Sequence, residues 1–254
     1  MNERKNETLG AIDKMEALKE KGLVYFDVDL TDKEKEVAQE IKIEQSKEFD
    51  YFGPLNEDLI KNLAEYFSQL GKNSSETANI LSEFVARMAE ETKREFNAEW
   101  VWVNLRTTLP THEYDLARWH KDGGYFQSDE EFYKFVFPIK GLPTRFAKVA
   151  EGKEAEYEKL QQEDGKNNTK LFNEEINEEE FERENTRIRK ALILVVEEIE
   201  SPGNEQAALY AVNNRQTSKI HSEPPMNNEN GRIFLQVLPG PKEKIEEWQR
   251  RCEE

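Results

Sequence analysis

Two different periodicities divide the chain near residue 100. Before that point, apolar residues recur every three or four positions, the spacing of the buried stripe on an amphipathic helix. Three helices are expected there, each beginning at a residue type that favours helix N-termini: Thr31 to about Lys47, a second from Asn56 and a third from Ser75. A strand at 22–30 precedes them, and residues 1–22 are a charged leader compatible with a helix. Residues 1–98 are therefore predicted to be a helical support region that belongs to the same domain as the β-rich part of the chain.

After Trp100 the pattern changes to short runs of β-branched and aromatic residues separated by turn residues. Strands are expected at 100–106, 132–139, 144–149, 191–199, 207–213 and 232–238. The last of them comes after Asn230-Gly231, a hairpin-type turn signal. Many strands at short spacing predict a mainly β fold with α-helices, namely a jelly roll (double-stranded β-helix) at 99–240. Residues 241–254 are expected to form a C-terminal helix or tail.

Residues 150–190 interrupt the strand pattern with a charged segment. It contains 13 acidic and 8 basic residues, with helix-compatible stretches at 151–163 and 173–190. The simplest interpretation is a solvated helical insertion between strands. The alternative is a lid over a site, a role that long insertions often have.

Composition narrows the class of protein. The 254 residues carry a formal net charge of −17, which repels phosphate backbones and disfavours a nucleic-acid partner. There is no long apolar run, so no membrane span is expected, and the charged N-terminus does not have the pattern of a secretory signal. The single cysteine, Cys252, fits a reducing compartment, and a cytoplasmic location is expected.

Two of the three histidines stand in a pattern that is typical of a non-haem iron centre. His120 and Asp122 form an H-x-D pair, and His221 lies on a later strand-like segment. Two histidines and one carboxylate can occupy one face of an octahedral Fe(II) and leave the other positions open. The backbone is expected to bend at the H-x-D pair so that both of its ends reach one ion, and Gly123-Gly124 supplies the needed freedom. His221 is expected to come from a different strand.

Arg232 is a candidate anion-binding residue. It lies eleven positions after His221 and begins the strand whose alternate residues include Phe234 and Gln236. The opposite set (Ile233, Leu235 and Val237) is expected to pack on the helices. An arginine on the inner face is costly to bury without an anion, and a dicarboxylate would supply one. The alternative is an ordinary ion pair with Glu223 or Glu229.

The order H-x-D, His and then Arg resembles the Fe(II)- and 2-oxoglutarate-dependent dioxygenases. Gly141-Leu-Pro-Thr144-Arg-Phe146 is similar to the G-G-x-T-x-F segment of prolyl-hydroxylase-like members, with Leu142-Pro143 as a departure. The order of motifs also resembles an uncharacterised group of predicted dioxygenases. The resemblance covers about residues 104–238. It implies iron held by His120, Asp122 and His221, with 2-oxoglutarate bound through Arg232 and Asn104.

The function implied by the resemblance is the coupled decarboxylation of 2-oxoglutarate and hydroxylation of a second substrate. That substrate is expected to be a small molecule or a peptide side chain, with an anion favoured by four cationic residues expected near the site: Arg106, Arg118, Lys121 and Arg145. Tyr125 and Phe126 would line the pocket or fill the core. Two alternatives stay open: a non-catalytic jelly-roll interaction protein, and a cupin-like metal enzyme that does not use 2-oxoglutarate.

Overall fold

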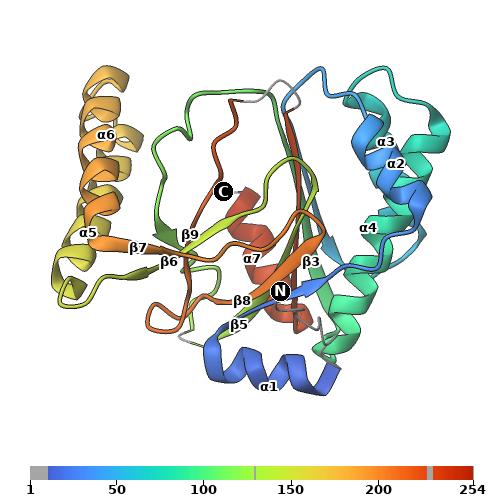
Figure 1. Cartoon of the computed structure of the whole chain (residues 1–254), viewed down its shortest axis with the longest axis horizontal. Helices are drawn as coiled ribbons and strands as arrows, with labels where there is room; N and C mark the ends of the chain where they lie inside the picture. The colour runs from blue at the N-terminus through green and yellow to red at the C-terminus, as the bar shows by residue number, and fades with distance from the viewer. Residues whose placement is uncertain (1–10, 129, 228–230, 254) are drawn as a thin grey trace, which may run out of the picture.

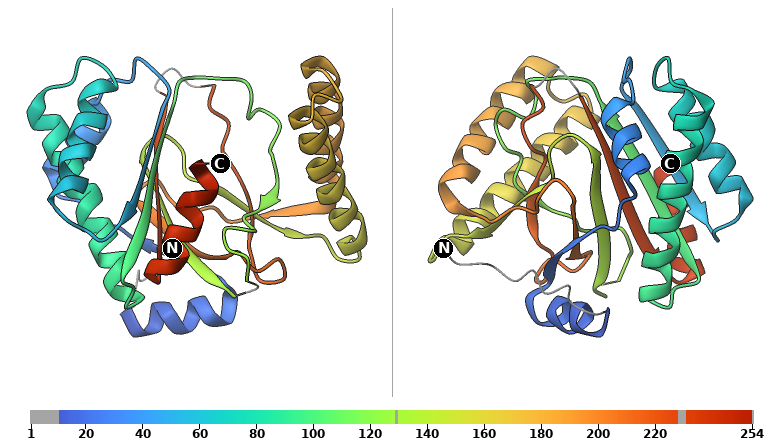
Figure 2. Two further views of the ribbon diagram at one scale, coloured as in Figure 1. Left: turned by 180° about the vertical axis from the view of Figure 1, so that it is seen from behind. Right: turned by 45° about the vertical axis from the view of Figure 1, so that its right-hand side comes forward.

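Two antiparallel β-sheets form the centre of the protein, and helices cover their outer faces (Figures 1 and 2). The structure is a computed structural model, and it describes residues 11–128, 130–227 and 231–253. The larger sheet has six strands in the order β1 (Leu23–Asp27), β8 (Gln206–Val212), β5 (Phe132–Lys140), β10 (Arg232–Gly240), β3 (Trp100–Thr108) and β2 (Lys47–Gly53). The smaller sheet has four, in the order β4 (His120–Lys121), β9 (Ile220–Ser222), β6 (Arg145–Val149) and β7 (Val196–Ile199). The mainly β fold with helices is thus confirmed as a sandwich-like arrangement of two sheets.

The N-terminal helices cover the outer face of the larger sheet. They are α2 (Asp32–Glu40), α3 (Glu57–Gln69) and α4 (Ser75–Glu95), and α1 (Ala11–Lys21) packs at the end formed by β1 and β8. Their apolar stripes share one core with alternate residues of the strands, including Ile233, Leu235 and Val237 as predicted. Because the other set of alternate residues points away from the helices, the inner face of β10 carries Arg232, Phe234 and Gln236.

Capping explains where two of these helices begin. The Thr31 side chain accepts a hydrogen bond from the Glu34 amide, and the Glu34 carboxylate accepts one from the Thr31 amide, which forms a capping box. At α4 the capping side chain is Ser74, one residue before the predicted start.

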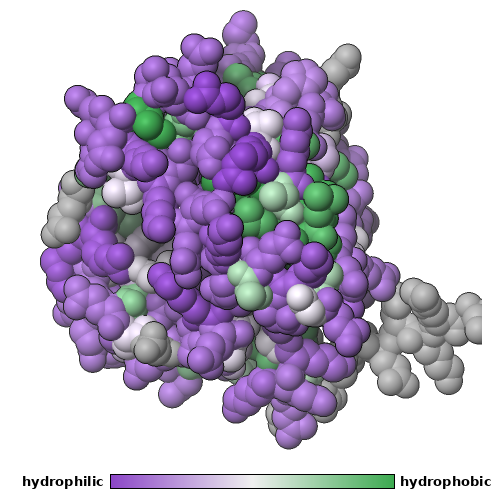
Figure 3. Space-filling model, turned by 90° about the vertical axis from the view of Figure 1, so that its left-hand side faces the viewer, coloured by the Kyte–Doolittle hydropathy of each residue, from purple (hydrophilic) through white to green (hydrophobic). Residues whose placement is uncertain are grey.

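The insertion forms a helical hairpin on the outer face of the smaller sheet. It consists of α5 (Glu154–Phe172) and α6 (Glu178–Val195), on the far side of the molecule from α2–α4 (Figures 1 and 2). Tyr157, Leu160, Ile188 and Leu192 are buried in a cluster with Trp119 and Ile220. The opposite side of the hairpin is exposed, and the face of the molecule that carries it is largely hydrophilic (Figure 3).

The C-terminal helix α7 (Lys242–Glu253) lies between the two sheets at one end (Figure 1). Its Ile245 and Trp248 pack with Trp102, Phe234 and Leu238 on the inner face of the larger sheet. This second apolar cluster therefore fills part of the space between the two sheets, and polar side chains line the rest of that space.

Two expected elements differ from the structure. The helix from Thr31 ends at Glu40, and the segment predicted to continue it leads into strand β2 (Lys47–Gly53). Phe49 and Tyr51 alternate with acidic residues there and pack on the helical core, which favours a strand. The expected strand at 191–199 is helical through Val195, because the repeat of Ile188, Leu192 and Val195 buries one helical stripe.

The other predicted helix and strand boundaries agree with the structure to within about five residues. The exception is the first insertion helix, which was expected to end at residue 163 and ends at Phe172. Asn230 and Glu229 lie outside the described residues, whereas Gly231 has φ of 63°, a conformation that favours glycine. In the described ranges, no helix is both long and apolar enough to cross a bilayer.

Candidate metal centre

The two histidines of the predicted centre lie side by side on adjacent strands of the smaller sheet. β4 and β9 are so short that they pair through two residue pairs, and one of these places His120 directly opposite His221. Their ring centroids are 4.4 Å apart. The pairing of two short strands thus brings together side chains from distant parts of the sequence.

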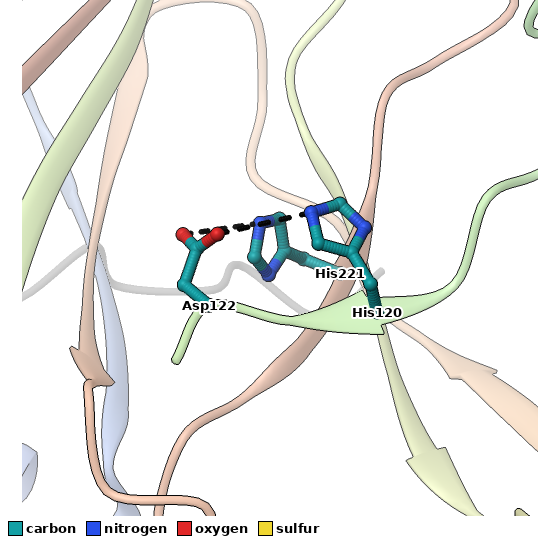
Figure 4. Close-up of side chains that lie close together, drawn as sticks. All are labelled: His120, Asp122 and His221. Atoms are coloured by element: carbon teal, nitrogen blue, oxygen red, sulfur yellow. Dashed lines mark ion pairs between the residues drawn. The ribbon is translucent and has the colours of Figure 1, made fainter. Parts of the chain in front are cut away.

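Asp122 lies just after β4 and turns its carboxylate toward both rings (Figure 4). Oδ1 lies 3.8 Å from His120 Nε2, and Oδ2 lies 3.4 Å from His221 Nε2. One ligand atom from each of the three residues lies within 4.8 Å of the others, which is close enough for all three to bind one ion. The backbone leaves the strand here: Asn213 N donates to Asp122 O at 3.0 Å, and Gly124 has φ of 74°.

Backbone carbonyls orient both imidazole rings in the same way. His120 Nδ1 is 2.7 Å from Arg118 O, and His221 Nδ1 is 3.1 Å from Lys219 O. A carbonyl accepts, so Nδ1 of each ring carries the hydrogen, and each Nε2 presents its lone pair toward Asp122. A hydrogen bond from the second ring nitrogen is what fixes histidine ligands in metal sites.

The protonation states also suit ligands of a cation. Burial lowers the pKa of His221 to about 4, although Asp122 acts in the opposite direction, so the ring is neutral near pH 7. Burial alone would raise the pKa of Asp122, but Lys134 and the two histidines outweigh it and hold the pKa well below its usual range. Two imidazoles and one carboxylate are the donor set that a non-haem iron site needs.

Two further side chains, Lys134 and Tyr210, donate to the Asp122 carboxylate. Lys134 Nζ donates a hydrogen bond to Oδ2, and the Tyr210 hydroxyl donates to the same oxygen at 3.0 Å. Lys134 is on β5 and only 2% exposed, and its Nζ also donates to Tyr125 Oη and Gln236 Oε1, each at 3.0 Å. Neither Lys134 nor Tyr210 belongs to a motif that sequence reasoning selects.

A cavity of about 410 Å³ joins this cluster to Arg232. Arg232 is 3% exposed, and its guanidinium donates to two neutral acceptors, Leu142 O at 2.9 Å and Thr144 Oγ1 at 3.3 Å. The ion pair with Glu223 that the sequence left open does not form, and Glu229 lies outside the described residues. Burial lowers the pKa of Arg232 to about 10, with Glu223 acting in the opposite direction. A guanidinium faces the cavity without a hydrogen-bonded carboxylate among the described residues.

Asn104 was predicted to bind the co-substrate, but its amide is fully used within the protein. Its Nδ2 donates to Glu48 Oε1 at 2.9 Å and to Asp50 Oδ1 at 3.0 Å, and its Oδ1 accepts from Gln236 Nε2 at 2.6 Å. Asn104 is 1% exposed. Asn104 does not line the cavity, and its role as a co-substrate ligand stays a prediction.

Of the four cationic candidates, Arg106 and Arg118 line the cavity. They lie 3.9 and 4.0 Å respectively from Glu223 Oε1, and neither forms a hydrogen bond with that carboxylate in the described part of the chain. Glu223 itself is charged: burial would raise its pKa, but His120 and Arg118 lower it to about 2. Sequence reasoning considered this carboxylate, two residues after His221, only as an ion-pair partner, and the structure makes it a cavity residue.

The remaining cationic candidates point elsewhere. Lys121 Nζ donates to Arg215 O at 2.7 Å, and Arg145 pairs with Glu198 and stacks over Trp119. Tyr125 lines the cavity and contacts Lys134, while Phe126 packs against Phe132. The expectation that Lys121 and Arg145 lie at the mouth of the site is therefore wrong.

Comparisons with known proteins give a weak structural likeness and no match in sequence. No family model matches the chain, and no curated protein sequence does. Among solved structures it is similar to the crystal structure of a prolyl-4-hydroxylase from Pseudomonas putida, with 10% sequence identity and a TM-score of 0.40, over 95% of this chain and 97% of that chain. These values are too low to establish function, which has to be inferred from the residues of the site.

Proposed function

We propose that this protein is an Fe(II)- and 2-oxoglutarate-dependent oxygenase, and specifically a hydroxylase. The observation that carries the proposal is the shared cavity: two imidazoles and a carboxylate converge at one place, and a buried arginine whose described hydrogen-bond acceptors are neutral lines the same cavity. His120, Asp122 and His221 would hold the iron, and Arg232 would bind the distal carboxylate of 2-oxoglutarate.

The strand order supports a jelly-roll core. Counted from β3 to β10, the eight strands are arranged as 6-3-8-1 in one sheet and 2-7-4-5 in the other, with β1 and β2 added at the edges of the first. Double-sheet jelly rolls have eight strands in two Greek keys. In this arrangement the second strand (β4) and the seventh (β9) are neighbours, which is why the H-x-D segment meets His221.

Each of these residues has a defined task in the proposed reaction. The iron would activate oxygen and couple decarboxylation of 2-oxoglutarate, giving succinate and carbon dioxide, to hydroxylation of a second substrate. The backbone carbonyls of Arg118 and Lys219 keep both imidazoles oriented, and Arg232 orients the dicarboxylate so that its 2-oxo acid end faces the histidines. Thr144 and Leu142 in turn fix the guanidinium.

We propose a small anionic molecule or an acidic peptide side chain as the second substrate. Arg106 and Arg118 lie on the cavity wall, and Glu223 between them makes no hydrogen bond with either guanidinium in the described part of the chain. Arg106 already donates to Glu48 Oε1 at 3.3 Å, so an arriving carboxylate could form with Arg118 the bidentate contact that Glu223 does not. With a net charge of −17, the protein is a poor binder of nucleic acid.

The alternatives make different predictions. A cupin-like centre would draw further histidines to the metal, but the third histidine, His112, is 85% exposed at its side chain and pairs with Asp115. A non-catalytic interaction protein would have no reason to keep a buried guanidinium, free of any described carboxylate partner, beside three metal-ligand side chains. We therefore favour the oxygenase.

Anaerobic titration provides the test. Wild-type protein loaded with Fe(II) should develop a visible charge-transfer band on addition of 2-oxoglutarate, and it should release succinate when oxygen is admitted. His221→Ala should abolish the band through loss of the metal, and Arg232→Met should weaken 2-oxoglutarate binding while metal binding persists. His112→Ala is the matched control and should behave as wild type. Metal binding that is equal in the His221 and His112 variants would refute the proposed centre.

A further inference from the structure

Lys134 is a buried lysine whose three hydrogen bonds are all within the site. It is the third residue of β5, where its neighbours Tyr133 and Phe135 point toward the helical side and its own side chain points inward. Its Nζ donates to Asp122 Oδ2, Tyr125 Oη and Gln236 Oε1, which uses all three hydrogens of an ammonium group. It also lies over the Tyr125 and Tyr210 rings, at 5.5 and 5.3 Å from their centroids. Because burying a charged lysine is costly, its position calls for a physical reason.

Hydrogen bonds fix Lys134 from behind. Gln236, which accepts from Nζ, donates through Nε2 to Asn104 Oδ1, and Asn104 donates to Asp50 and Glu48 at the edge of the sheet. Gln236 and Asn104 are directly paired in the register of β10 and β3, and Asn104 is paired with Asp50 of β2. The chain of side-chain bonds thus crosses four neighbouring strands of the inner face. Lys134 cannot move away from Asp122 without breaking several of these bonds.

The consequence for Asp122 is that its two oxygens are not equivalent. Lys134 and Tyr210 both donate to Oδ2. Oδ1 is the oxygen nearer His120, at 3.8 Å from its Nε2, and accepts from neither of them; Oδ2 lies 3.4 Å from His221 Nε2. A carboxylate can bind a metal through one oxygen or through both, and an oxygen that already accepts two strong hydrogen bonds is a poor second ligand.

We propose that Lys134 is a positioning residue that restricts Asp122 to binding the metal through a single oxygen. The inference rests on the proposed metal centre. With one carboxylate oxygen bound, three protein ligands leave three positions of an octahedron, two for the 2-oxo acid and one for oxygen. Binding through both oxygens would occupy one of those positions, so Lys134 protects the place of the co-substrate or of oxygen.

Co(II) alone is the probe for this test, because its visible d–d bands respond to which atoms occupy its coordination positions. The variant is Lys134→Met, which keeps the length and removes the donor. Its control is Lys140→Met on the same strand, since Lys140 Nζ contacts only the backbone carbonyls of Gln39 and Ile41 among the described residues, away from the cavity. Full-length protein is titrated with Co(II), and the loaded protein is then titrated with 2-oxoglutarate.

We expect Lys134→Met to bind Co(II) with d–d bands shifted from those of wild type, because a second carboxylate oxygen replaces a water. We also expect it to bind 2-oxoglutarate about 10- to 100-fold more weakly, the range by which metal affinity or activity falls when a residue that positions a metal ligand is removed. Lys140→Met should reproduce the wild-type spectrum even if it is less stable. If Lys134→Met does not fold, Tyr210→Phe, which removes the other donor to Oδ2, should shift the spectrum in the same direction.

An unchanged spectrum and an unchanged 2-oxoglutarate affinity in a folded Lys134→Met would overturn the inference and leave Lys134 as a stabilising residue only. Failure of the underlying centre has a different signature: wild-type protein would then bind no Co(II) that His221→Ala removes. The two failures are distinguishable in the same titration.

Discussion

Arg232 permits a prediction in which stability and ligand binding respond differently to one substitution. The substitution is Arg232→Met, which keeps most of the apolar stem and removes the guanidinium. In a protein that uses this arginine only to support the fold, the loss of stability should be large. If Arg232 instead serves to bind an anion, its removal should cost little until the anion is added.

The magnitude comes from the surroundings of the guanidinium. Burial lowers the pKa of Arg232 from 12.5 to about 10, which corresponds to roughly 3 kcal/mol of unfavourable charge burial at about 1.4 kcal/mol per pKa unit. Against this stand two hydrogen bonds to neutral acceptors, worth about 1 kcal/mol each. The contact with the Phe234 ring, 3.9 Å away, adds about 1 kcal/mol. Because these contributions nearly cancel, the stability of Arg232→Met should lie within about 1 kcal/mol of wild type.

Denaturant unfolding with and without 2-oxoglutarate measures both parts, with Co(II) present throughout. At a hundred times its dissociation constant, the ligand should stabilise wild type by about 2.7 kcal/mol and Arg232→Met by far less. Arg189→Met is the control, since Arg189 is another buried arginine with neutral acceptors, Asn185 Oδ1 and Glu113 O, but lies in α6. It should keep the full ligand effect. An Arg232→Met variant that retains the 2-oxoglutarate shift, or that loses more than about 4 kcal/mol without ligand, would refute the reasoning.

Three further predictions concern the fold and the partner. Gly152→Ala should lower the free energy of unfolding by roughly 1–2 kcal/mol, because its backbone is left-handed but its surroundings are open. Gly231→Ala should lower it further, because a Cβ there would lie 2.8 Å from Thr108 O. Thermal unfolding compares the two variants, and equal losses of stability would contradict the clash. Leu192→Ala should lower the free energy of unfolding by about 2–5 kcal/mol, because Leu192 is 2% exposed, whereas Leu194→Ala should lower it by less than about 0.5 kcal/mol, because Leu194 is 78% exposed. Denaturant unfolding midpoints measure both losses, and a small loss for Leu192→Ala would mean that the helical hairpin is loosely attached. Binding of DNA or RNA should be undetectable at micromolar concentration and physiological salt in an anisotropy assay, and salt-sensitive binding there would count against a small or peptide substrate.

The three residues of the candidate metal centre could be picked out because their chemistry is evident in the sequence. The spacing of His120 and Asp122 is local, and His221 is one of only three histidines in the chain, so few combinations exist. Arg232 could be selected for a similar reason, since strand periodicity places it on the face opposite Ile233. What spacing cannot supply is the register that sets His120 opposite His221, which depends on tertiary pairing.

The elements that were predicted wrongly are those in which tertiary packing decides between two plausible patterns. Residues 191–195 are apolar and β-branched enough for a strand, yet they extend α6 because one stripe of that helix faces the smaller sheet. Strand β2 was not predicted, because its alternate residues Glu48 and Asp50 are charged and give the segment little of the pattern of a buried strand. Both ambiguities arise from short apolar runs, for which periodicity alone does not separate helix from strand.

Lys134 shows where a sequence signal existed but had no interpretation. Lys134 stands between Tyr133 and Phe135 in a strand whose other residues up to Ile139 are aromatic or apolar, so it breaks the pattern at a buried position. Periodicity says that it faces inward, but only the register of β5 with β10 says that it meets Gln236, and only the turn after β4 says that it meets Asp122. Whether a buried charged residue supports the fold or a functional site depends on the groups it contacts. Such a residue therefore becomes a functional candidate only once the fold is known.

The same dependence on partners bears on the charged insertion. A lid would have to reach the cavity, but no residue of 150–190 lines it in the described chain, and the buried side of the hairpin faces the outer surface of the smaller sheet instead. That sheet carries both histidines on short strands, β4 and β9, which have few hydrogen bonds of their own to hold them. Gln161 of α5 donates to Trp119 O, immediately before His120, and Leu192 packs in the cluster that contains Ile220, immediately before His221. The hairpin therefore supports the two histidine strands from behind, and its high charge belongs to the solvent side of a structural layer.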